Sequence, residues 1–153
     1  HTNDAPTTIT RLIDMGVEPF LIASSVICIL SQRLVRKLCD KCKEKYTPTT
    51  DLIKQLGLTQ EKASEITFYK AAGCDECLNT GYKGRIAIFE IMEVNDEIAH
   101  LIVERVDSSV IKAKAIKLGM TQLGLDGIRC IKNGVTTIEE VLAVSYLEEA
   151  EAE

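Results

Sequence analysis

Cys39-Asp40-Lys41-Cys42 and Cys74-Asp75-Glu76-Cys77 are the two Cys-x-x-Cys motifs of this chain, and 31 residues separate them. A Cys-x-x-Cys turn can direct two sulfur atoms at one metal ion, and two such turns supply the four thiolates of a closed tetrahedral zinc site. We therefore expect these four cysteines to bind a structural zinc ion. Because every ligand position is a cysteine, no position stays open for water, which argues against a catalytic zinc. Two redox dithiols and an iron–sulfur cluster are the alternatives.

The residues around the two motifs also suit a thiolate site. Gly73 directly precedes the second motif, and Lys37, Lys41 and Lys43 surround the first. Backbone amides and cations both stabilise thiolates. The gap between the motifs is longer than in a minimal zinc ribbon, so we expect it to hold structure of its own. Two short helices are predicted over residues 51–56 and 60–66, followed by a short strand over 67–69.

Composition limits the classes of protein to consider. The chain has 153 residues, of which 46% are hydrophobic and 27% charged, and this fits one compact domain or two small ones. It carries 18 Lys and Arg against 23 Asp and Glu, a net charge of −5, which is unusual for a dedicated nucleic-acid binder. Cys28 and Cys130 lie alone in apolar stretches, so we expect both to be packing residues.

The first 38 residues are predicted to be helical. One helix begins near Asp4-Ala5-Pro6, and a second, apolar nearly all round, is expected over residues 19–38. Its apolar stretch is too short to span a membrane. We expect a sheet built by residues upstream of this chain to cover that helix, so its apolar side chains should be exposed here. These are Phe20, Leu21, Ile27, Leu30 and Leu34. The competing expectation is that they are buried within the chain.

The rest of the chain adds one strand and several helices. Residues 86–92 alternate well enough for a strand. Asn95 can cap a helix, Ser108 or Ser109 another, and residues 121–133 form a third. Thr136/Glu139 and Thr137/Glu140 are overlapping capping boxes for a last helix that reaches about residue 146. The expected fold is mainly α with a few short β-strands around a tetracysteine zinc module.

The sequence contains no complete catalytic site that we can identify. No stretch has the Gly-x-x-x-x-Gly-Lys-Ser/Thr spacing of a phosphate loop. With only two histidines, His1 and His100, no nucleophile–base set suggests itself. We predict that this chain alone is inactive as an enzyme.

Three stretches form an ordered set along the chain. They are residues 1–5 (HTNDA) with 11–21 (RLIDMGVEPFL); 32–39 (QRLVRKLC) running into Cys42, with 73–77 (GCDEC) and 81–85 (GYKGR); and 119–120 (GM), 126–127 (DG) and 134–142 (GVTTIEEVL). In this order they resemble the histidine box, tetracysteine subdomain and C-terminal helical region of the GspE/PilB group of type II secretion and type IV pilus assembly ATPases. Retraction motors of that superfamily lack the cysteine quartet, so the resemblance favours an assembly or secretion motor.

The resemblance implies more than the residues alone do. It implies the truncated C-terminal portion of a RecA-like α/β P-loop ATPase, with terminal helices of the core over 1–37, the zinc module over 38–84 and a helical C-terminal subdomain over 85–153. His1 would lie near the nucleotide, and ATP and Mg²⁺ would bind the intact parent protein. That parent would be a cytoplasmic homohexamer, peripheral at the inner membrane through a platform protein, without nucleic acid and without direct membrane insertion.

A second class of function stays open at this stage. A non-enzymatic zinc ribbon could bind nucleic acid or protein. Residues 33–54 hold seven basic residues against three acidic ones, which favours nucleic acid, whereas the net charge of −5 opposes it. Binding through several phosphates weakens steeply as salt rises, so a salt titration separates the two classes.

Overall fold

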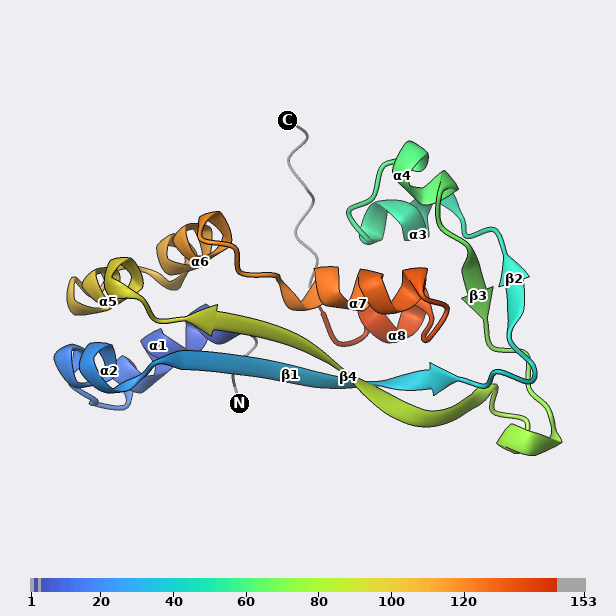
Figure 1. Cartoon of the computed structure of the whole chain (residues 1–153), viewed down its shortest axis with the longest axis horizontal. Coiled ribbons are helices and arrows are strands. Elements are labelled where there is room, and N and C mark those ends of the chain that lie inside the picture. Colours follow the sequence, from blue (N-terminus) through green and yellow to red (C-terminus); the bar gives the residue numbers. More distant parts are fainter. Residues whose placement is uncertain (1, 3, 146–153) are drawn as a thin grey trace. The chain divides into compact units, whose positions relative to one another are not determined.

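The computed structural model describes residue 2 and residues 4–145, which divide into two compact units (Figure 1). Unit 1 comprises His1–Gln32 and Phe89–Leu123, and unit 2 comprises Arg33–Ile88 and Gly124–Glu153. Two long strands, β1 (Cys28–Leu38) and β4 (Tyr82–Glu93), pair with each other and contribute residues to both units. The assignment of domains to 1–37, 38–84 and 85–153 stays a prediction.

Unit 1 is built mainly from four helices. Their bounds are Ala5–Asp14 for α1, Pro19–Ser25 for α2, Asp96–Val103 for α5 and Ser108–Lys117 for α6. The helices α2 and α5 pack together, as do α1 and α6. Asn95 caps α5 as predicted, with its side chain accepting a hydrogen bond from the Ile98 backbone at 3.1 Å. Asp107 rather than a serine caps α6, because its carboxylate accepts from the Ser109 backbone.

A buried carboxylate joins three elements of unit 1. Glu90, on β4, is only 2% exposed. One of its oxygens accepts a hydrogen bond from the Ala5 backbone at the start of α1, at 2.7 Å, and the other accepts from the Leu123 backbone at 3.3 Å. Both N–H groups begin helices, where the backbone has no intrahelical acceptor. Glu90 therefore anchors α1 and the first residue of α7 to the strand.

Unit 2 contains short elements around one apolar cluster. Strands β2 (Glu44–Tyr46) and β3 (Phe68–Lys70) are antiparallel, with Tyr46 opposite Phe68. The other bounds are Thr50–Gln55 for α3, Gln60–Ser64 for α4, Asp75–Cys77 for a 3₁₀ turn, Leu123–Lys132 for α7 and Ile138–Leu142 for α8. The core brings the segment between the cysteine motifs against α7 and α8; its buried members are Ile53, Leu56, Ala63, Phe68, Ile128, Ile131, Ile138 and Val141.

The last helix of unit 2 begins with half of a predicted capping box. Thr137 accepts a hydrogen bond from the Glu140 backbone at 3.4 Å, as the sequence indicates. The Glu140 carboxylate, however, binds Arg36 on β1, accepting from its backbone at 2.8 Å and from its Nε at 2.9 Å. The end expected for this helix near residue 146 lies outside the described residues.

The prediction of one helix over residues 19–38 is wrong. The helical part ends at Ser25, and residues from Cys28 to Leu38 form β1. Two serines followed by the β-branched residues Val26 and Ile27 lower helix propensity and favour a strand. A short apolar run fits a buried helix or a strand equally well, so periodicity alone did not separate them.

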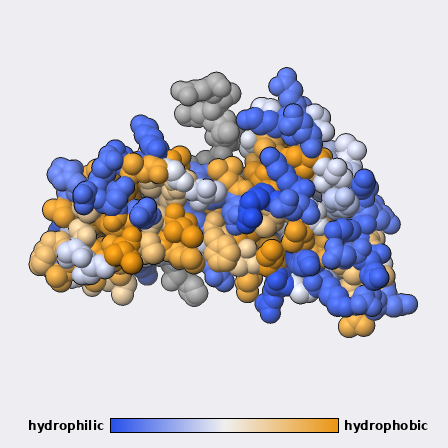
Figure 2. All heavy atoms as spheres, viewed as in Figure 1, coloured by the Kyte–Doolittle hydropathy of each residue, from blue (hydrophilic) through white to orange (hydrophobic). Residues whose placement is uncertain are grey.

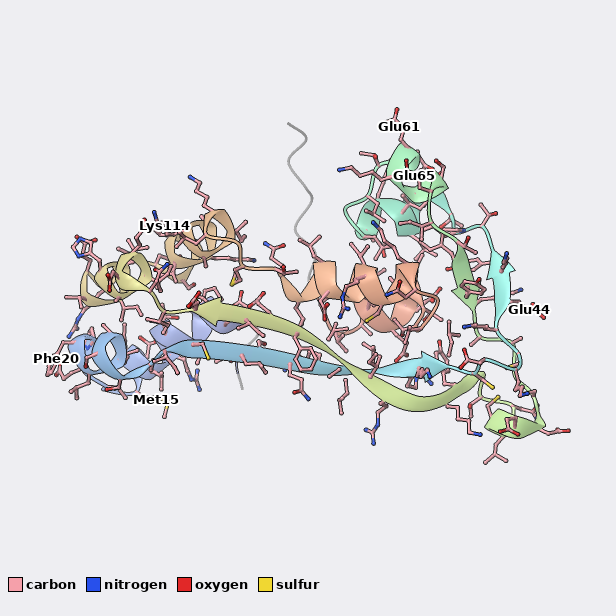
Figure 3. The ribbon with its side chains drawn as sticks, viewed as in Figure 1. Met15, Phe20, Glu44, Glu61, Glu65 and Lys114 are labelled. Atoms are coloured by element: carbon pink, nitrogen blue, oxygen red, sulfur yellow. The ribbon has the colours of Figure 1, made fainter. Side chains whose placement is uncertain are left out.

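The exposure predicted for this segment is confirmed, although on different elements. Ile27 is 80% exposed and Phe20 59%, and Leu21, Leu30 and Leu34 are each about half exposed. Figure 2 shows hydrophobic residues at the surface of unit 1 around α2, and in Figure 3 the side chains of Met15 and Phe20 point outward. The competing expectation, burial of these side chains within the chain, is wrong.

Among the described residues, no helix combines the length and the apolar character that crossing a membrane requires.

Replacing Glu90 with Ala is expected to destabilise unit 1 by about 2–3 kcal/mol, because two buried N–H groups lose a charged acceptor. Chemical denaturation followed by circular dichroism measures this loss. Glu93→Ala, on the same strand but exposed, is the matched control and should change stability by less than about 0.5 kcal/mol. Equal stability losses in the two variants would show that Glu90 is not an anchor.

Candidate metal centre

The sulfur atoms of Cys39, Cys42, Cys74 and Cys77 all lie within 4.8 Å of one another. The Sγ–Sγ distances are 3.9 Å for Cys39 and Cys74, 3.8 Å for Cys42 and Cys77, and 3.7 Å for Cys74 and Cys77. Tetrahedral ligands about 2.3 Å from a central ion lie about 3.8 Å apart, so the spacing suits one ion bound by four sulfurs. Cys39 and Cys77 are buried, and Cys42 and Cys74 are half-buried. The arrangement can hold one metal ion.

The backbone builds this cluster from two similar turns. Cys39 directly follows β1, and Lys43 donates a backbone hydrogen bond to its carbonyl at 3.0 Å. Cys74 is the N-cap of the 3₁₀ turn, and the Cys77 backbone donates to the Cys74 carbonyl at 3.2 Å. The Cys39 backbone also donates to the Gly81 carbonyl at 2.9 Å. This bond ties the first turn to the residue that leads into β4.

Backbone N–H groups point at the sulfur atoms, as the sequence predicts for the residue before Cys74. Gly73 donates to the Cys42 sulfur at 3.3 Å, and Gly81 donates to the Cys77 sulfur at 3.2 Å. A third bond runs from the Cys74 backbone to the Cys77 sulfur at 3.3 Å. Such donors stabilise a thiolate relative to a thiol. They give the ligand set the outer hydrogen bonds that orient metal ligands.

Burial and hydrogen bonding shift the pKa values of two of the four thiols in opposite directions. Burial raises the pKa of the Cys42 thiol to about 12. Burial also acts on Cys77, but the N–H groups of Cys74 and Gly81 outweigh it and lower the pKa of Cys77 to about 6. These hydrogen bonds therefore favour the thiolate form of Cys77, which is the form that binds a metal ion. Binding releases the protons of the remaining thiols.

The lysines beside the two cysteine motifs pair with acidic residues. Lys43 binds Asp40 at 2.8 Å and the Gly134 carbonyl at 3.0 Å, and Lys37 lies 3.8 Å from Asp40. Lys83, at the start of β4, binds Glu76, and this bond is the main reason that its pKa is raised; the charges of Cys39 and Cys74 raise it further.

Two glycines permit the close approach of the segments that precede and follow the second cysteine motif. Gly73 has φ +106°, and a Cβ added there would lie 2.8 Å from the Asn79 carbonyl oxygen. Gly81 has φ +75°, and its Cβ would lie 2.5 Å from the Ala71 Cβ. Both positions combine left-handed backbone with contacts too short for a side chain.

Other residues singled out by sequence lie away from this cluster. Cys130 is 3% exposed within the core, as predicted, whereas Cys28 is exposed on β1, so its interpretation as a packing residue is wrong. Cys28 occupies a position on the open side of the strand, where its apolar neighbours are exposed as well. His1, the candidate nucleotide-proximal residue, lies outside the described residues.

Gly73→Ala is expected to weaken Co²⁺ binding, used as a spectroscopic probe, by about tenfold or more, because the new Cβ displaces the turn that carries Cys74 and Cys77. Gly84→Ala is the matched control. Gly84 also has positive φ (+78°), but its Cβ would meet no atom within 4 Å. The control should lose stability without losing metal affinity. Equal Co²⁺ affinities in both variants would refute the role assigned to Gly73.

The sequence is similar to proteins of bacterial pilus assembly and secretion. Residues 1–143 match the family described as "Type II/IV secretion system protein". The type IV pilus assembly ATPase PilB of Thermus thermophilus is 48% identical over 143 residues, which are 94% of this chain and 16% of that protein. PilB of Myxococcus xanthus is 41% identical, covering 93% of this chain and 25% of that protein.

A type II secretion protein has a similar level of sequence identity to this chain. The type II secretion system protein HxcR of Pseudomonas aeruginosa is 40% identical, covering 95% of this chain and 27% of that protein. The chain thus spans between about one sixth and just over one quarter of the length of these three relatives. Because the family match covers nearly the whole chain, the protein belongs to the type II/IV secretion system protein family.

Proposed function

We propose that this chain is the C-terminal region of a hexameric cytoplasmic ATPase that powers assembly of a type IV pilus or of a type II secretion pseudopilus. The observation that carries the proposal is the closed four-sulfur cluster, in a chain whose relatives are named as pilus assembly ATPases and secretion proteins. Residues 1–37 would be the last part of a RecA-like core, 38–84 the zinc module and 85–153 a C-terminal subdomain.

In this proposal the metal is zinc and its role is structural. Four thiolates leave no ligand position for water or substrate, which is the pattern of structural rather than catalytic zinc. The ion would hold together two turns whose own elements are short, and thereby stiffen the surface through which the motor transmits motion to an inner-membrane platform protein. The protein would associate with the membrane only through that partner.

The nucleotide would bind residues outside this chain. The sequence holds no phosphate loop to grip the β- and γ-phosphates and place Mg²⁺. The exposed apolar side chains of α2 and β1 give a surface for further parts of the same motor to cover, since large exposed apolar patches usually mark an interaction surface. His1 would approach the nucleotide of the intact motor.

The purified chain is expected to contain one zinc ion, and Cys74→Ser should abolish zinc retention and unfold the region from 38 to 84. The reason is that structural zinc supplies about 10 kcal/mol of folding free energy to such modules. Elemental analysis and circular dichroism measure both effects. Cys28→Ser, a change to an exposed cysteine outside the cluster, is the control and should keep its zinc. Zinc-free protein from a chelator-free purification would contradict the proposal.

A chimera tests the motor assignment. The corresponding segment of Thermus thermophilus PilB is replaced by residues 1–143 of this chain, and ATP hydrolysis and assembly state are measured. The chimera should hydrolyse ATP as a hexamer, the same chimera with Cys39→Ser and Cys74→Ser should not assemble, and the isolated chain should show no ATP turnover. ATP hydrolysis by the isolated chain, or a folded, zinc-loaded chimera that is inactive, would count against the proposal.

A further inference from the structure

The loop between α7 and α8 lies against the end of β1 that leads into the first cysteine motif. The backbone of Leu38, the residue before Cys39, donates a hydrogen bond to the Val135 carbonyl at 2.8 Å. The Thr136 hydroxyl donates to the Arg36 carbonyl at 2.8 Å, and Thr136 is only 1% exposed. The latter bond joins residues that are 100 positions apart in the sequence. These two bonds hold the loop on the strand from which the first cysteine turn begins.

The same loop also contacts the first cysteine turn itself. The ammonium group of Lys43, the residue after Cys42, donates to the Gly134 carbonyl at 3.0 Å. This ammonium group also lies over the Tyr69 ring on β3, 5.3 Å from the centroid. A Cβ added to Gly134 would lie 2.9 Å from Cε2 of that ring. The loop therefore fits against the cysteine turn and β3 so closely that no side chain has room at this position.

Side chains fix the first turn of α8 to β1 and β4. Glu140, on α8, accepts hydrogen bonds from the Arg36 backbone at 2.8 Å and from its Nε at 2.9 Å. The Arg36 guanidinium lies over the Tyr82 ring, 4.0 Å from the centroid, and the Tyr82 hydroxyl is 3.2 Å from the Thr137 hydroxyl. Tyr82 directly follows Gly81, which donates a hydrogen bond to a sulfur of the cluster. Both strands that border the cysteine turns thus contact the same end of α8.

Apolar packing joins the same parts of the chain. The buried cluster of unit 2 combines side chains from α3, α4 and β3, all between the two cysteine motifs, with side chains from α7 and α8. Opening either half of such a cluster exposes apolar surface of the other half to water. The two halves are therefore expected to open together as one cooperative unit.

We propose that metal binding by the four cysteines is coupled to the docking of α7 and α8. In the docked state, the cysteine turns and the loop between the two helices hold each other in place. Without the metal the turns lose their common partner, the contacts of Lys43 and Arg36 lose their fixed geometry, and both helices open more easily. The coupling is reciprocal, because contacts that stabilise the docked helices must also strengthen metal binding. This inference rests on the zinc site proposed above.

The coupling also refines the grouping of the C-terminal helices. The division proposed above places residues 85–153 in one subdomain, apart from the zinc module. Under the coupling, α7 and α8 respond to the metal, whereas α5 and α6, which pack in the core of unit 1, do not. The two groupings therefore predict opposite results for α7 and α8.

Hydrogen–deuterium exchange of the full zinc-loaded chain, read by mass spectrometry before and after zinc removal with a chelator, tests the coupling. Peptides from α7 and α8 should exchange at least about tenfold faster without zinc, because exchange follows the population of the locally opened state. Peptides from α5 and α6 are the internal control and should change by less than about twofold.

Two outcomes of this measurement would overturn the inference while leaving the zinc site intact. The first is unchanged exchange in α7 and α8 of a chain that bound zinc and then lost it. The second is an equal increase in all four helices, because the metal would then support the whole chain. A chain that is purified without any zinc would contradict the zinc site itself and thereby remove the basis of the coupling.

The affinity for Co²⁺, used as a spectroscopic probe, tests the reverse direction. Glu140→Gln keeps the shape of the side chain but removes the charge that binds Arg36, and should weaken Co²⁺ binding about fivefold. Glu139→Gln is the matched control: it is the adjacent, exposed residue of α8, and should change the affinity by less than about twofold. Circular dichroism verifies that both variants are folded. Equal Co²⁺ affinities in the two variants would refute the reciprocal coupling.

Discussion

The fold of unit 2 depends on the meeting of four sulfur atoms. Cys39 and Cys74 are 35 residues apart in the sequence, and the segment between them forms strands of three residues and helices of five and six. Elements this short do not hold their shape alone, since isolated helices need about 12–15 residues even to be marginal. In the structural role that we propose, a metal ion bound by both turns would close this loop and fix the start of β2 and of β4. The apolar cluster that reaches α7 and α8 then completes the unit.

Much of this architecture could be predicted from short sequence motifs, because the interactions that these motifs make involve residues close together in the sequence. Cysteine spacing predicted which four sulfur atoms lie close together, and side chains such as Asn95 and Thr137 indicated where helices begin. The N–H group of Gly73 was also expected at a sulfur, and it donates to Cys42. The helix caps and the Gly73 N–H group each lie within a few residues of a recognisable motif. The four cysteines are far apart in the sequence, but their shared ability to bind a metal ion predicts that they meet.

The features that sequence did not reveal arise from long-range pairing. A strand that begins at Cys28 was mistaken for a helix because a short apolar run fits both structures, and the pairing with β4 decided between them. Arg36 reaches Glu140, 104 residues away, only once the chain has folded.

The structural role that we propose requires four thiolates around one zinc ion. X-ray absorption at the zinc K-edge of the purified full chain tests this most directly. We expect a single shell of four sulfur scatterers at about 2.3 Å from zinc. A shell that contains nitrogen or oxygen ligands, a second metal at short distance as in a cluster, or no bound zinc at all would contradict it.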